Sequence, residues 1–184
     1  VRSMPHAARR PAASAAVIGV DMASGDVAWT LAEWGDLDLT QGSFPDIQHG
    51  LDIEGDKILL YDNGAIPTTR AVEYDIDAAA GTATQTWEWT ESGFREAWGW
   101  GDVDYLGDDR VVIGKGHVPG AGGDGPSEVI EVDRADGTVL WRLSMGEETD
   151  AIYSADRIGG CELFSEASRC PAVAQRLEAL AEWL

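Results

Sequence analysis

The sequence is short of positive charge: its 184 residues include 13 Lys and Arg against 33 Asp and Glu, a formal net charge of −20. Such a chain repels nucleic-acid phosphates and anionic membrane surfaces. No uninterrupted apolar run approaches the roughly 18 residues that a membrane span needs. Apolar residues nevertheless make up 44% of the chain, which argues against disorder. The composition predicts a folded protein with no nucleic-acid partner and no membrane span.

Cysteine is also scarce, with two residues, Cys161 and Cys170. They precede apolar residues at helical spacing from Val173 to Leu184, so residues 159–184 are predicted to form a Cys-bracketed segment and a short amphipathic C-terminal helix. The two thiols are a candidate disulfide in an exported protein and would stay reduced in the cytosol. With no histidine nearby to complete four ligands, we expect no zinc site, and no metal or cofactor.

Several catalytic motifs are missing. The sequence has no Gly-x-Ser-x-Gly and no Gly-x-x-x-x-Gly-Lys-[Ser/Thr], which leaves serine hydrolase and P-loop chemistry without support. The acidic stretches at 52–56 and 107–109 do not have EF-hand spacing, and we expect hairpin turns there rather than calcium loops.

The sequence does contain an internal repeat. Segments beginning at Ile18, Val72 and Ile130 each show alternating apolar residues, a glycine turn and a second alternating stretch with tryptophan. Their shared positions lie 54 and 58 residues apart, namely Asp21, Asp75 and Asp133, and Trp29, Trp87 and Trp141. A second repeated element, at 49–64 and 101–116, reads as another pair of strands. Together they predict units of four strands in about 50 residues, as in β-propeller blades.

This pattern predicts an all-β fold, a β-propeller arc with the short C-terminal helix. Residues 1–16 are expected to be a flexible tail, and 17–158 to hold about two and a half to three blades. Whole blades are expected at 49–89 and 101–143, and one further strand at 150–158. An open arc leaves unpaired edges, so either the rest of the ring lies on residues missing from this chain or copies associate into a homo-oligomer.

Histidine is rare enough for each of the three to be weighed. His6 lies in the tail, His49 begins the first strand of a blade, and His117 opens a glycine-rich loop directly after a strand. Arg70, at the start of another strand, has a guanidinium suited to oxyanions. Each of the last three residues also has a purely structural interpretation. His49 would be a turn or core histidine, His117 an exposed loop residue, and Arg70 a partner in a surface ion pair.

Tryptophans of this repeat are more typical of packing between blades than of ligand binding. Trp98 and Trp100 are the exception, since they flank a glycine just before a strand, where an aromatic wall could receive a planar substrate.

Four quoted stretches together resemble the arylsulfotransferase family: "IQHGLDIEGDKILLYDNG", "TTRAVEYDIDAAAGTATQTWEW", "WGWGDVDYLGDDRVVIGKG" and "IYSADRI". The resemblance covers about residues 17–158 and implies the C-terminal half of a six-bladed propeller. It implies transfer of a sulfuryl group from a phenolic sulfate ester to a phenol acceptor through a sulfated histidine, without a nucleotide donor. Members are commonly periplasmic or secreted, so a periplasmic or extracellular location is expected.

Carried over by position, His117 falls near the nucleophilic histidine of that family, and His49 matches a histidine that contacts the sulfate. Arg70 matches the arginine of the family's Ser-Arg pair, with Thr69 in place of the serine. Independently of this match, Asn63, Trp98 and Trp100 are expected to contact the substrate. The early His-Thr-Asn segment of the family has no counterpart here. Three readings follow: an active enzyme, an incomplete or inactive fragment, or a noncatalytic propeller that binds a ligand or protein partner.

Overall fold

The computed structural model describes residues 15–64, 69–91, 100–116, 127–145 and 152–157. Within these residues it contains eleven β-strands and no helix, so the predicted all-β class is confirmed. The expected C-terminal helix and the cysteine pair lie outside the described residues, as does the tail to residue 14. The strands are β1 (Val17–Val20), β2 (Val27–Leu31), β3 (Asp38–Gln41), β4 (Gln48–Glu54), β5 (Lys57–Asp62), β6 (Arg70–Asp77), β7 (Thr82–Trp89), β8 (Asp102–Gly107), β9 (Arg110–Lys115), β10 (Glu128–Asp133) and β11 (Val139–Ser144).

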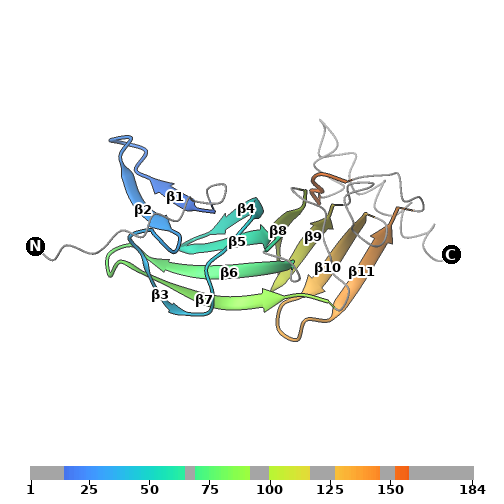
Figure 1. Ribbon diagram of the computed structural model, residues 1–184. Coiled ribbons are helices and arrows are strands. Elements are labelled where there is room, and N and C mark those ends of the chain that lie inside the picture. The colour runs from blue at the N-terminus through green and yellow to red at the C-terminus, as the bar shows by residue number, and fades with distance from the viewer. Residues whose placement is uncertain (1–14, 65–68, 92–99, 117–126, 146–151, 158–184) are drawn as a thin grey trace, which may run out of the picture.

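These strands form three sheets that follow one another along the chain (Figure 1). Hairpin A consists of β1 and β2. Sheet B is the antiparallel meander β4 to β7, extended by β3, which pairs in parallel with β7. Sheet C is a second antiparallel meander, β8 to β11. The strand β3 lies between the first hairpin and the whole blade expected at 49–89, in a stretch where the repeat pattern predicted no strand.

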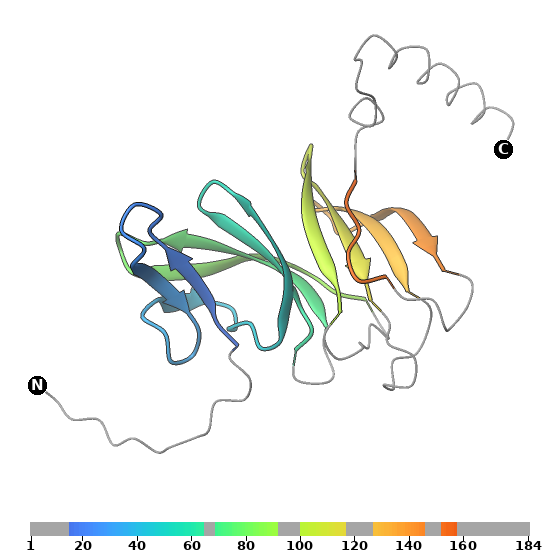
Figure 2. The same ribbon diagram turned by 90° about the horizontal axis from the view of Figure 1, so that it is seen from above.

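Sheet B is covered on both faces, which explains why β5 reads as a continuous apolar run. Leu59 and Tyr61 belong to the cluster shared with sheet C, whereas Ile58 and Leu60 belong to the cluster shared with hairpin A. All four are buried. Figure 2 shows the resulting succession of layers, from hairpin A through sheet B to sheet C.

The repeat seen in the sequence is also a repeat of backbone register. In hairpin A, in β6–β7 and in β10–β11, the pairing slips at the same place, between Gly19 and Val20, Glu73 and Tyr74, and Glu131 and Val132. The residue before each slip pairs with a tryptophan, namely Trp29, Trp87 or Trp141. Such bulges twist a ladder locally, and the three tryptophans occupy equivalent register positions opposite them.

The strand predicted at 150–158 is wrong for the residues described there. Residues 152–157 pair with no described strand. Side chains hold the segment instead: the Ile152 N–H donates to Ser127 Oγ at 3.1 Å, and Arg157 Nη1 donates to Glu131 Oε2 at 2.9 Å. An alternating pattern forms a strand only where a backbone partner lies alongside.

The junction of sheets B and C contains a buried carboxylate. Glu73 is 1% exposed and accepts hydrogen bonds from Lys57 Nζ at 3.1 Å, Thr86 Oγ1 at 2.5 Å and Tyr105 Oη at 2.8 Å. Arg134 of sheet C completes the set. Burial acts to raise the pKa of Glu73, but these donors outweigh it and hold that pKa below its ordinary value.

We predict that Glu73→Gln lowers the free energy of unfolding by about 3–5 kcal/mol at neutral pH, because it leaves two cations without their buried partner. Since the folded-state pKa is depressed, the contribution of Glu73 is complete above the unfolded-state pKa and is lost as pH falls through the folded value. Urea titrations at several pH values measure both effects. The matched control is Glu54→Gln, at an exposed position on β4; an equal loss in both variants would contradict the assignment.

Candidate functional site

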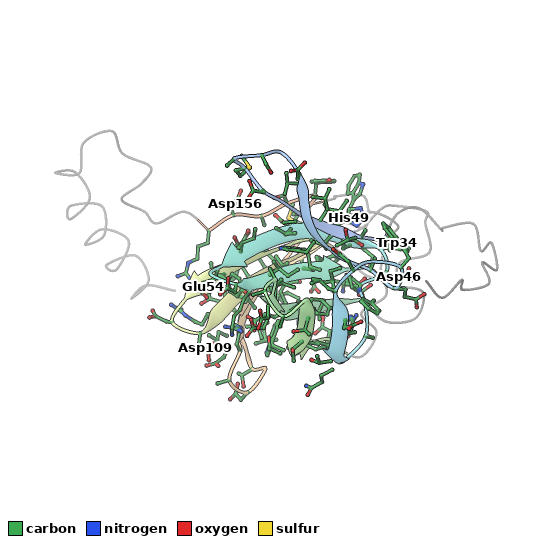
Figure 3. The ribbon with its side chains drawn as sticks, turned by 90° about the vertical axis from the view of Figure 1, so that its left-hand side faces the viewer. Trp34, Asp46, His49, Glu54, Asp109 and Asp156 are labelled. Atoms are coloured by element: carbon green, nitrogen blue, oxygen red, sulfur yellow. The ribbon has the colours of Figure 1, made fainter. Side chains whose placement is uncertain are left out.

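His49 lies on β4 and lines a shallow hollow of about 290 Å³ between β4 and β1. Figure 3 shows it close to hairpin A. The other residues around the hollow are Ala16, Val17, Ile18, Gln48, Gly50, Leu51 and Leu60. Most of this lining is apolar, and none of these residues carries a positive charge. The hollow therefore offers one titratable group, the imidazole.

A chain of hydrogen bonds fixes that imidazole. His49 Nδ1 lies 2.6 Å from Asn63 Oδ1, and Asn63 Nδ2 donates to the Trp100 carbonyl at 3.2 Å. Because the Trp100 carbonyl can only accept, the Asn63 amide nitrogen faces it and the amide oxygen faces His49. Nδ1 of His49 must then carry the proton. In the neutral ring, this leaves the Nε2 lone pair available as a base or nucleophile.

Asp62, next to Asn63, holds the surrounding loop. Its Oδ1 accepts from the backbone N–H groups of Asp46, Ile47 and Gly64 at 3.1–3.2 Å. Its Oδ2 accepts from Arg70 Nε at 3.0 Å. Within the Asp-Asn-Gly stretch, Asp62 therefore holds the loop closed and Asn63 orients His49. Asp62 was not predicted as a site residue, although the Asp-Asn-Gly stretch is part of the family resemblance.

Arg70 is held by internal acceptors around its whole guanidinium group. Besides Asp62, it donates to Glu88 Oε2 at 2.7 Å, Ser43 Oγ at 2.9 Å and the Phe44 carbonyl at 3.3 Å. Burial acts to lower the pKa of Arg70, but Glu88 and the neighbouring charges outweigh it and raise that pKa. In this arrangement the side chain ties β6 to the loop before β4.

The remaining expected site residues are divided between described and undescribed parts of the chain. Trp100 packs edge-on against Tyr153, with ring centroids 6.0 Å apart, and its carbonyl serves Asn63. Trp98 and His117 lie outside the described residues. Gly116 packs so closely against Trp100 that an added Cβ would lie 2.5 Å from the Trp100 Cβ. Gly116 therefore lies directly against Trp100, whose carbonyl bonds Asn63.

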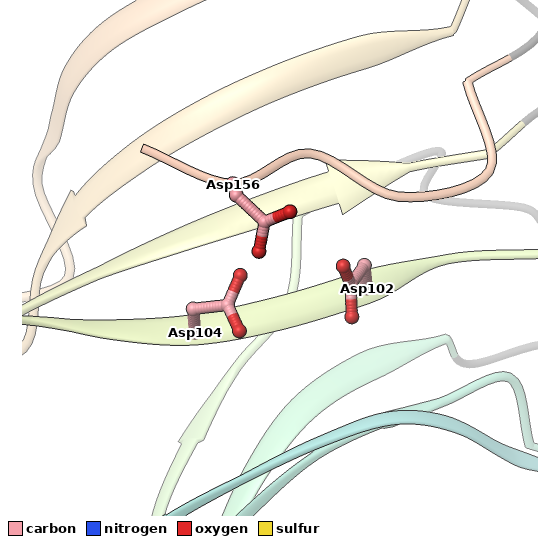
Figure 4. A group of neighbouring side chains, drawn as sticks. All are labelled: Asp102, Asp104 and Asp156. Carbon is pink, nitrogen blue, oxygen red and sulfur yellow. The ribbon is translucent and has the colours of Figure 1, made fainter. Parts of the chain in front are cut away.

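A second polar group, not predicted from the sequence, lies on sheet C. Asp102 and Asp104 of β8 converge with Asp156, and their nearest ligand-type oxygens all lie within 4.8 Å of one another (Figure 4). Ser154 Oγ donates to Asp102. Burial, together with the charges of Asp102, Asp156 and Asp52, raises the pKa of Asp104 to about 6. The alternation in "DVD" places Asp102 and Asp104 on one face, but only the fold brings Asp156 to them.

These features define an all-β repeat protein with a hydrogen-bonded histidine at the end of one sheet. Its sequence matches the Arylsulfotransferase (ASST) family over residues 13–154. The chain belongs to that family. No curated protein matches the sequence. Among the described residues, no helix is long and apolar enough to cross a membrane.

We predict that Asp104→Asn stabilises the fold at pH 7.5 and has little effect at pH 4. The folded-state pKa of Asp104 is raised, so the proton binds the folded state more tightly. Stability from this group is complete below the unfolded-state value and is lost as pH rises through about 6. Removing the charge should raise the Tm at pH 7.5 by about 2–4 °C, corresponding to about 1 kcal/mol in a chain of this size. Thermal melts at both pH values test this, and equal shifts would contradict it.

Proposed function

We propose that the protein transfers a sulfuryl group from an aryl sulfate to a phenol, with His49 in the site. Membership of the arylsulfotransferase family supports the reaction class. The observation that carries the assignment to this place in the fold is the hydrogen-bond chain from Trp100 through Asn63 to His49. It fixes the tautomer that a nitrogen base or nucleophile requires.

The proposed reaction has two steps. In the first, a histidine nitrogen attacks the sulfur of the ester, the sulfur–oxygen bond to the ring breaks, and phenolate leaves. In the second, the oxygen of the acceptor phenol attacks the same sulfur, the nitrogen–sulfur bond breaks, and the phenol proton passes to a base. We assign the attacking nitrogen to His117, as the resemblance implies, and contact with the sulfate to His49.

Arg70 is proposed as a positioning residue. Its donors meet Asp62, Glu88 and backbone or hydroxyl oxygens, and it acts on the site through Asp62, which closes the loop that carries Asn63. Contact between Arg70 and a sulfate would require one of these partners to be released. Oxyanion charge in the transition state would then depend on hydrogen-bond donors such as His49.

We also propose that β4–β7 and β8–β11 are two blades of a propeller. Hairpin A and residues 152–157 would belong to the blades on either side. The equal bulge positions in the three hairpins and the succession of layers in Figure 2 support this arrangement.

A noncatalytic binding module is the second candidate, and one observation favours it. The hollow around His49 is mainly apolar and contains no Lys or Arg among its lining residues. Such a surface suits the aromatic part of a ligand better than its sulfate group.

The test is release of p-nitrophenol from p-nitrophenyl sulfate by the purified chain, with and without added phenol. We predict acceptor-dependent release that falls about 10²–10⁴-fold in His49→Ala and in His117→Ala, the range for loss of an acid–base group. The matched control is His6→Ala, outside the proposed site in the sequence pattern, which should retain full activity. A folded wild-type chain without activity would contradict an enzyme that is active alone. It would favour either the binding module or an incomplete fragment of the enzyme.

Asn63→Asp tests the positioning of His49 separately. A carboxylate beside Nδ1 favours the imidazolium, so the acidic limb of the pH–rate profile should move to higher pH. Asn63→Ala should reduce kcat about 3- to 10-fold, as expected for loss of one net hydrogen bond. An unchanged pH profile in Asn63→Asp and an unchanged kcat in Asn63→Ala, with normal thermal melts, would remove Asn63 from this role.

A further inference from the structure

Sheets B and C carry the same row of four side-chain types on corresponding faces. Each row runs across the four strands of its meander through directly paired residues. The rows are Asp52, Leu59, Glu73 and Trp87 in sheet B, and Asp104, Val112, Glu131 and Trp141 in sheet C. The same surface is therefore presented twice.

In sheet B this row is engaged by sheet C. The Tyr105 N–H donates to Asp52 Oδ2 at 2.9 Å, and the Tyr105 hydroxyl donates to Glu73. Arg134 donates to Glu73, and its carbonyl accepts from Trp87 Nε1 at 3.0 Å. Arg134 also lies over the Trp87 ring, 5.7 Å from its centroid. Asp52, Glu73 and Trp87 thus each form hydrogen bonds with sheet C.

In sheet C the corresponding row is only half satisfied. Asp104 Oδ2 is buried and has no hydrogen-bond partner among the described residues. Trp141 is 50% exposed and Leu143 is 47% exposed. A groove of about 430 Å³ lies over this face, lined by these two residues with Val112, Val129, Glu131, Ala155, Asp156 and Arg157. Apolar side chains at such exposure indicate a surface that is covered in an assembly.

The opposite end of the stack exposes the matching surface. Ile18 and Val20 of hairpin A occupy the same register positions as Ile130 and Val132, the residues with which β10 packs on sheet B. Ile18 and Val20 are each 51% exposed, whereas their counterparts are fully buried. Met22, one residue beyond Asp21 as Arg134 is beyond Asp133, is 94% exposed.

We propose that hairpin A of a second copy of this chain docks into the groove on sheet C. Ile18 and Val20 of that copy would cover Val129 and Leu143, as Ile130 and Val132 cover sheet B. Trp141 Nε1 would donate to the Met22 carbonyl, repeating the bond from Trp87 to Arg134. The inference does not depend on the proposed sulfuryl transfer.

Charge complementarity favours this hairpin as the occupant. In sheet B the carboxylate of Glu73 needs Arg134 from the arriving layer, together with Lys57. In sheet C the equivalent Glu131 is already paired with Arg110 at 2.7 Å and with Arg157 at 2.9 Å. A third cation at this position would find both oxygens of Glu131 already paired. Hairpin A carries the uncharged Met22 at that position, and a thioether suits the exposed Trp141 ring.

The contact joins different surfaces on the two copies, so it is heterologous: it gives a closed ring where the rotation between copies closes, as when two copies engage each other twice, and an open chain otherwise. Each copy carries a formal net charge of −20, so long-range repulsion opposes association. Added salt screens this repulsion. The interface should therefore strengthen as sodium chloride is raised.

Sedimentation velocity of the full chain, over a range of concentrations at low and high salt, tests the inference. We expect reversible association that is stronger at high salt. Ile18→Lys and Leu143→Lys should each weaken it about tenfold or more, as for a residue at the centre of an interface. Ile53→Lys is the control of equal charge change, at a 59% exposed apolar residue on β4 that belongs to neither surface; it should associate as the wild type does.

Mixing the two interface variants separates this arrangement from other kinds of dimer. In an equimolar mixture, the intact groove of Ile18→Lys can meet the intact hairpin of Leu143→Lys, so association should recover above the level of either variant alone. A wild-type chain that stays monomeric at every concentration and salt overturns the inference. Association that survives both substitutions, or a mixture without recovery, also overturns it.

Discussion

The contact on which the arrangement of sheets depends is the buried carboxylate of Glu73. Sheet B supplies the acid and Lys57, and sheet C supplies Tyr105 and Arg134. A buried charge tolerates little displacement of its partners, since each unsatisfied donor or acceptor costs free energy. Apolar clusters hold the layers together without direction, whereas this group fixes how one sheet sits on the next. Trp87 and Trp89 also donate hydrogen bonds from sheet B to sheet C, to backbone carbonyls in the β10–β11 turn.

The site inherits its geometry from this stacking. Asn63 directly follows β5 of sheet B. The carbonyl that orients its side chain belongs to Trp100, just before β8, the first strand of sheet C. Gly101 lies against the Tyr61 ring, where an added Cβ would be 2.1 Å from the nearest ring atom, and its φ of +146° is a conformation that favours glycine. The close approach of the two sheets at this point lets a backbone carbonyl reach the Asn63 amide. A change in the spacing between sheets B and C would therefore alter the hydrogen bonds that orient the His49 imidazole.

Much of the fold could be predicted from the sequence because the strand pairs are local: period-two alternation and glycine turns marked both four-stranded meanders. The strand expected at 150–158 failed over its described residues because alternation does not show whether a partner strand is present. For the site, His49, Arg70, Asn63 and Trp100 were singled out by pattern and resemblance. The contacts of these residues were not predicted, since Arg70 bonds Ser43 and Asn63 bonds Trp100 across separations that no local pattern records.

The shared irregularity in the three hairpins also bears on the history of the chain. A bulge occurs at the same register position, opposite a tryptophan each time, although the residue before it is Gly19 in hairpin A and Glu73 or Glu131 in the other two hairpins. Bulges are inherited features of a fold rather than chance defects. Duplication of one gene segment would produce such a shared position in all three hairpins. Recombination between such segments adds or removes whole units in frame, so chains of different unit number can arise without any new surface being invented.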